Sequence, residues 1–204
     1  MNTRVTTSGQ KTRQMAMLAM LSAVIIVLQA LSSIIRFGPF AITLALTPII
    51  IGAAIYGWKA GAILGFVFSA YVFCSGLWID GSMVAMIQYS FFGTTILCFL
   101  KGIAAGAAAG LVYHALAEKK PFLASLAAGI VTPIVNTGIF AAGMMTIMNG
   151  FLSEVAVANG STNPMSFLFL IMIGANFIVE FLVNVALATV ITRIIAYYNK
   201  KIRK

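Results

Sequence analysis

The residues that could do chemistry in this chain of 204 are few, and most of them interrupt long apolar segments. Lys101 and Asn136 each lie well inside such a segment, and a third segment carries Asn176, Glu180 and Asn184. Their spacing, i, i+4 and i+8, puts the last three on one face of a helix. Polar groups within apolar segments are costly and usually functional. A lysine and several amides predict a site that holds a small polar molecule.

Catalytic and metal-binding patterns are missing from the sequence. It has no Ser/His/Asp set, no HExxH and no Walker motif, and its glycine-rich GIAAGAAAG lies inside an apolar segment. Cys74 and Cys98 are not a CxxC pair and have no histidine beside them. His114 is more typical of an interfacial residue than of a proton relay. We therefore expect no enzyme activity, no metal and no cofactor.

The composition indicates which elements must position these residues. Hydrophobic residues make up 61% of the chain, charged residues make up 8%, and the mean hydropathy is +1.04. Soluble domains carry about 25% charged residues, so a soluble fold is excluded. Six stretches of about 20 residues or more lack Lys, Arg, Asp and Glu: 14–35, 37–58, 60–79, 81–100, 121–153 and 155–179. A membrane helix needs about 20 mostly apolar residues, which predicts an all-α integral membrane protein.

Six transmembrane helices are predicted, forming a single membrane domain over residues 1–204. The first apolar stretch is long for a signal peptide and lacks a clean cleavage site, so we interpret it as a retained span. The predicted spans are about 15–34, 40–56, 60–78, 90–116, 122–147 and 166–197.

The basic residues lie at span ends and predict the orientation. One side holds Arg4, Lys11, Arg13, Lys59, Lys119, Lys120, Lys200, Lys201, Arg203 and Lys204. The other side holds Arg36 with the acids Asp80 and Glu154. The positive-inside rule then predicts that both termini are cytoplasmic. Because the net charge of +9 is explained in this way, we expect no nucleic acid as a partner.

The outer side is predicted to carry the ligand entrance. The links 79–89 and 148–165 are longer and more polar than the cytoplasmic links, and long loops are often lids. The alternative is that these two links only connect helices and have no part in ligand entry. Arg36 and Gln88 stand at the outer edge and are candidates for ligand contact, although Arg36 would also serve as an interfacial anchor.

The polar residues inside the membrane converge at one depth. At about 1.5 Å per residue, Lys101, Asn136 and Asn176 all lie about 15 Å below the outer rim, and Glu180 is one turn deeper. Three helices therefore contribute to one predicted site with mostly apolar walls. The alternative is that Lys101 and Glu180 form a buried pair that only holds helices together.

Small residues follow two patterns. Glycine recurs at four-residue spacing in two spans: Gly61, Gly65, Gly102, Gly106 and Gly110. These rows predict close helix packing within the molecule. Ala16, Ala19 and Ala23 form a small-residue face near the cytoplasmic end of the first span, where another membrane helix could dock.

Several segments of the chain are typical of one transporter family. They are FGPFAITLALTPIIIGAAIYGWKAGAILGF, LKGIAAGAAAGLVY and TPIVNTGIF, together with the Ala19-x-x-x-Ala23 pattern. With six spans in about 200 residues, the chain resembles the substrate-binding S-components of energy-coupling factor (ECF) vitamin transporters over nearly its whole length.

The resemblance implies a division of labour. The S-component captures a water-soluble vitamin outside a prokaryotic cell, and a transmembrane coupling subunit with two ATPase subunits supplies the energy. The face at Ala16, Ala19 and Ala23 would dock the coupling subunit. The S-component would then topple in the plasma membrane and carry its site inward.

Within the family, the segments GPFAITLAL, LKG, PIVNTGIF and GANFIVEFLVN look most like the pantothenate branch. Pantothenate is a monocarboxylate with two hydroxyls and an amide. Lys101 or Arg36 could hold its carboxylate, and Asn136, Asn176 and Glu180 could bind the other groups. Folate, riboflavin and cobalamin stay open as alternative substrates. A stand-alone proton-coupled carrier stays open as an alternative function, and Glu180 is the one candidate for its proton relay.

Overall fold

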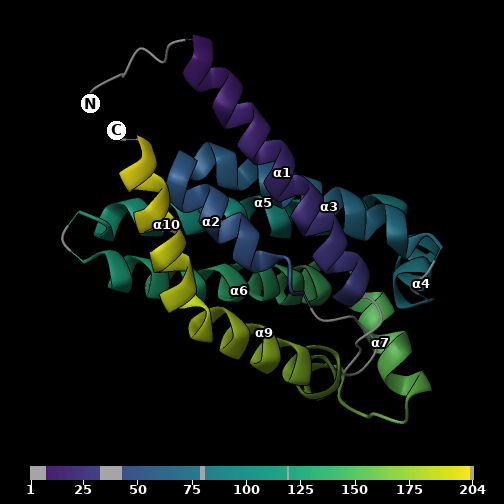
Figure 1. The fold of residues 1–204 in the computed structure, drawn as a ribbon. Helices are drawn as coiled ribbons and strands as arrows, with labels where there is room; N and C mark the ends of the chain where they lie inside the picture. Colours follow the sequence, from purple (N-terminus) through teal and green to yellow (C-terminus); the bar gives the residue numbers. More distant parts are fainter. Residues whose placement is uncertain (1–7, 33–42, 79–80, 119, 203–204) are drawn as a thin grey trace.

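The computed structural model describes residues 8–78, except 33–42, and residues 81–202, except 119. Most of these residues are helical, and none of them lies in a strand (Figure 1). The helices are α1 (Ser8–Ser32), α2 (Leu46–Tyr56), α3 (Trp58–Gly76), α4 (Gly81–Tyr89), α5 (Phe91–Leu116), α6 (Pro121–Thr146), α7 (Asn149–Ala158), α8 (Pro164–Ser166), the π-helix η1 (Phe167–Gly174), α9 (Ala175–Ala186) and α10 (Ala188–Ile202).

Five helical stretches are long and apolar enough to cross a membrane. They are Gly9–Ser32, Trp58–Gly76, Phe91–Leu116, Pro121–Thr146 and Pro164–Ala186. The apolar helix α2 is shorter, with 11 residues, and it corresponds to the described part of the predicted span 40–56. The protein is thus an all-α integral membrane protein. The number of six spans and the cytoplasmic position of the termini stay predictions.

The predicted span 166–197 needs a correction, because it is not one continuous α-helix. It begins as the π-helix η1, continues as α9 and bends at Leu187 into α10 (Figure 1). Gly174 permits the π-helical segment, since a Cβ there would lie 3.0 Å from the carbonyl oxygen of Phe169. Beyond the bend the sequence becomes more polar and basic, with Arg193, Lys200 and Lys201 in α10.

The predicted links 79–89 and 148–165 are also more ordered than their polar composition suggested. They contain the short helices α4 and α7. Both helices bury apolar side chains, among them Met86 of α4 and Leu152 of α7, and this burial explains why the links are helical. In Figure 1 they lie together at one end of the bundle.

The centre of the bundle is the tight packing of α3 against α5. Gly61 lies against the backbone of Gly106, and Gly65 lies against that of Gly102. The two helices are so close that a Cβ at any of these positions would overlap the other helix. Gly110 lies equally close to the backbone of Trp58. The prediction that the glycine rows pack helices within the molecule is confirmed.

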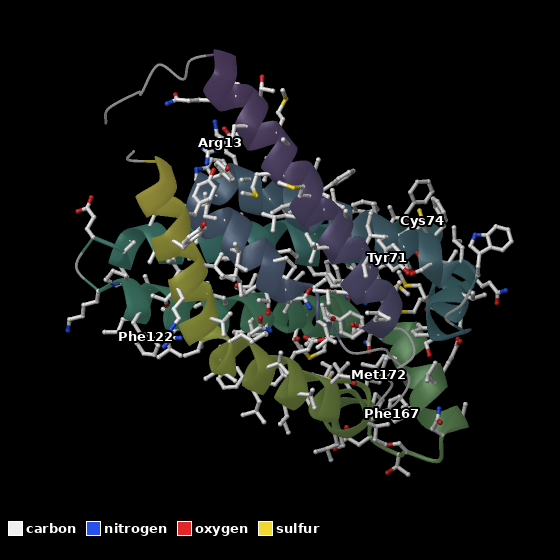
Figure 2. The ribbon with its side chains drawn as sticks, viewed as in Figure 1. Arg13, Tyr71, Cys74, Phe122, Phe167 and Met172 are labelled. Atoms are coloured by element: carbon white, nitrogen blue, oxygen red, sulfur yellow. The ribbon has the colours of Figure 1, made fainter. Side chains whose placement is uncertain are left out.

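The beginning of α1 and the end of α10 lie at the same end of the molecule, opposite α4 and α7 (Figure 1). There the Arg13 guanidinium carbon is 5.6 Å from the centroid of the Tyr198 ring, and Figure 2 shows Arg13 beside α10. The hydroxyls of Tyr56 and Tyr198 are hydrogen-bonded. These contacts tie α1, α2 and α10 together where the basic residues gather.

Candidate substrate-binding cavity

A cavity of about 120 Å³ lies among α1, α3, α4, α5, α6, η1 and α9. Its walls are mostly apolar, with Phe68, Val72, Met83, Met86, Leu97, Phe140, Met172, Ile173 and Phe177. Figure 2 labels two of the lining residues, Tyr71 on α3 and Met172 on η1. An apolar pocket with a few inward polar groups is the usual form of a small-molecule site.

Four of the residues singled out from the sequence line this cavity. Lys101 comes from α5, Asn136 from α6, and Asn176 and Glu180 from α9. The last three are at most 7% exposed. The structure therefore brings together side chains that are up to 79 positions apart in the chain, since Lys101 and Glu180 face the same space.

Two other candidates are not placed at the cavity. Gln88 is exposed on α4 and is not among the lining residues. The lining positions of that helix are Met83 and Met86, one turn apart, and Gln88 lies on a different face. Arg36 lies outside the described residues.

Glu180 has a structural partner in the segment just before α2. The backbone N–H of Thr43 donates to Glu180 Oε1 at 2.8 Å. One turn further along α9, the Thr47 hydroxyl donates to Asn184 Oδ1 at 3.2 Å, and Asn184 Nδ2 donates to the backbone carbonyl of Glu180 at 2.8 Å. This row of hydrogen bonds attaches α9 to α2 and fixes one oxygen of the Glu180 carboxylate.

Lys101 is the cation of the cavity. Its Nζ lies 5.1 Å from the centroid of the Phe140 ring, a favourable cation–π contact. No carboxylate of the described residues lies within 4.0 Å of this ammonium, so the alternative of a direct pair with Glu180 is not what the structure shows. A ligand carboxylate in the cavity could form a charge-assisted hydrogen bond with this ammonium.

Two carboxamides at the cavity are buried with an oxygen that no described residue pairs with. They are Asn136, 4% exposed, and Gln29, 6% exposed, and the oxygens concerned are Oδ1 and Oε1. Buried polar atoms in native proteins nearly always have a partner. A water molecule or a polar ligand in the cavity would supply it.

The sequence reasoning missed several polar lining residues: Gln29, Thr43, Tyr71, Ser75, Thr94 and Cys98. Gln29 carried a usable signal, because it is an amide within the apolar sequence of the first span. Some of the others are engaged within the protein. The Thr94 hydroxyl donates to the Met86 carbonyl at 2.8 Å, and the Cys98 thiol donates to the Ser69 carbonyl at 3.6 Å.

The small-residue face of α1 lies away from the cavity. Ala16, Ala19 and Ala23 are exposed, so the described chain does not cover them. The other side of α1 packs against α2 and α3 through Leu18, Leu21 and Ile25. An uncovered row of small residues permits close approach of another membrane helix.

The model of the family "ECF transporter, substrate-specific component" matches residues 13–195. This range includes every described lining residue of the cavity. The chain belongs to the substrate-specific components of ECF transporters. No curated protein and no solved structure matches the chain.

Family membership explains the main properties of the molecule. An S-component is a membrane-embedded substrate-binding subunit of a transporter and is not itself an enzyme. Membership implies association with an ECF module made of a coupling subunit and ATPases. The helices of this S-component and its apolar surface place it in the membrane.

Proposed function

We propose that this S-component binds pantothenate in the cavity and delivers it to the ECF module. The observation that carries the proposal is that one lysine and several buried amides line the same, otherwise apolar, cavity. Lys101 holds the ligand carboxylate by a charge-assisted hydrogen bond. Asn136 and Asn176 bind the hydroxyls and the amide, and the carboxylate of Glu180 accepts from a further hydroxyl.

The lining of the cavity favours pantothenate over the vitamins that carry a large flat ring. Its apolar walls consist more of aliphatic and methionine side chains than of aromatic rings. None of the described lining residues is a tryptophan that would stack on a large flat ring.

The face of Ala16, Ala19 and Ala23 is proposed as the docking surface for the coupling subunit. Its exposure on α1 supports this role, because a bundle that buried these alanines internally would leave no small-residue face for a partner. After docking, the S-component topples and carries the cavity to the cytoplasmic side. The chain thereby needs no energy-coupling element of its own.

Ligand retention tests the proposed substrate. The full chain is purified in detergent from cells grown with a mixture of water-soluble vitamins, and the ligand released on denaturation is identified by mass spectrometry. We expect the mass of pantothenate at a ratio of about one molecule per chain. Release of riboflavin, folate or cobalamin instead would overturn the proposed substrate while leaving the family membership intact.

A further inference from the structure

We propose that Gln29 is a specificity-determining residue of the cavity and recognises an uncharged hydrogen-bonding group of the ligand, a hydroxyl or an amide. This inference rests on the proposed function, since it adds a residue of α1 to the same site. It concerns selectivity among related ligands, whereas Lys101 is proposed to supply the charge.

Gln29 is directed into the cavity by a helix that otherwise exposes much of its surface. It is 6% exposed and lines the cavity, whereas Val24, Val27 and Leu31 nearby on α1 are between 46% and 57% exposed. At about 3.6 residues per turn, Gln29 lies on the side of α1 opposite the exposed Ala16. Of the described lining residues it is the one that α1 contributes.

The hydrogen-bonding state of Gln29 distinguishes it from residues that stabilise the bundle. Thr94 and Cys98, which also line the cavity, donate to backbone carbonyls of neighbouring helices, and Glu180 accepts from the N–H of Thr43. The buried Oε1 of Gln29 has no partner among the described residues. Its polar group is therefore placed at the cavity without serving a visible contact between helices.

A carboxamide in this position is suited to discriminate between ligands. It offers a donor and an acceptor on one flat group, so it can pair with a hydroxyl or with an amide. A ligand that supplies the partner satisfies the buried atom, whereas an analogue without that group displaces water and leaves the amide unpaired. Sites built in this way reject the analogue much more strongly than an apolar wall would.

The experiment compares Gln29→Met with Val27→Met in the purified full chain. Gln29→Met keeps the approximate length of the side chain and removes its hydrogen-bonding groups. Val27→Met puts the same residue on the exposed side of the same helix. Wild type and both variants are titrated with pantothenate, riboflavin, folate and cobalamin, and then with analogues of the binder that each lack one hydroxyl or the amide N–H.

We expect the wild type and Val27→Met to bind one of these analogues about tenfold more weakly than the parent vitamin, the effect of one ordinary hydrogen bond. Gln29→Met is expected to bind the parent about tenfold more weakly and to lose the discrimination against that analogue. In the ligand-free state its melting temperature is expected to equal or exceed that of the wild type, because no protein partner of Gln29 is lost.

Three results would overturn the role of Gln29: an unchanged affinity of Gln29→Met, an unchanged discrimination among the analogues, or a lowered ligand-free melting temperature with loss of all binding. The last would show that the amide supports the fold. A wild-type chain that binds riboflavin and not pantothenate contradicts the proposed substrate, and riboflavin analogues then decide on Gln29. A wild-type chain that binds none of the four vitamins overturns both ideas.

Discussion

Lys101 is the residue on which the charge of the cavity depends. Lys101→Met removes the ammonium and keeps an apolar side chain of similar length beside Phe140. A lost charge-assisted contact costs about 1.5–3 kcal/mol, which is about tenfold to a hundredfold in affinity. We expect titration calorimetry with pantothenate to show this loss, and Lys59→Met, at an exposed position on α3, to bind like the wild type. Equal affinities of the two variants would remove Lys101 from the site.

Glu180 is predicted to matter for folding through the oxygen that accepts from Thr43. Glu180→Gln keeps an acceptor for this N–H, whereas Glu180→Leu leaves the N–H buried without one. A buried group that loses its partner costs about 1–3 kcal/mol. Thermal unfolding in detergent is expected to show a near-normal melting temperature for Glu180→Gln and a clearly lower one for Glu180→Leu. If both variants melt alike, the hydrogen bond to Thr43 contributes nothing.

At the residue scale the sequence predicts the centre of the site and misses its edges. Lys101, Asn136 and Glu180 could be found because a polar group in an apolar span needs polar neighbours. It finds them either around a cavity or on another helix, as Asn184 finds Thr47. Gln88 had no such constraint, since an outer-edge residue is stable in water on any face of its helix. Gln29 satisfied the same criterion as Lys101 and could have been found by it.

The packing of α3 against α5 makes a clear prediction at the scale of elements. A side chain at Gly106 would overlap the backbone of Gly61, whereas nothing lies within 4 Å of a Cβ at Gly138 on α6. We expect Gly106→Val to lower the melting temperature strongly, because overpacking against backbone costs about 1–3 kcal/mol or more. Gly138→Val, the matched control, is expected to unfold close to the wild-type temperature. Similar melting temperatures would mean that α3 and α5 separate without penalty.

The elements that could not be predicted from the sequence are those without a hydrophobic periodicity. Residues 167–173 are all large and apolar. Their sequence therefore has no periodicity that would distinguish an α-helix from the π-helix η1. The links that contain α4 and α7 show no clear apolar stripe in sequence, and the apolar side chains that they bury are identified only by the packing against the bundle. Their helicity depends on tertiary burial of residues such as Met86 and Leu152, which composition does not reveal.

At the scale of the whole molecule, α1 is predicted to separate substrate binding from transport. Ala19→Trp places a bulky ring on the exposed small-residue face and should hold a docking helix away. Because this face lies away from the cavity, we expect near-normal vitamin binding by the purified variant, together with loss of uptake in cells and of co-purification with the ATPases.

Val24→Trp is the control for this experiment. Val24 is exposed at a similar height on α1 but points about 80° or more from the alanine face. We expect it to leave both binding and uptake largely intact. Equal losses of binding and uptake in Ala19→Trp would show that this part of α1 supports the bundle and is not the docking surface.

Binding of pantothenate in the cavity around Lys101 is tested by calorimetric titration of the purified wild-type chain with pantothenate and, separately, with riboflavin, folate and cobalamin. We expect one saturable site for pantothenate and no measurable binding of the three larger vitamins. Saturable binding of a larger vitamin, with none of pantothenate, would show that the cavity serves a different substrate.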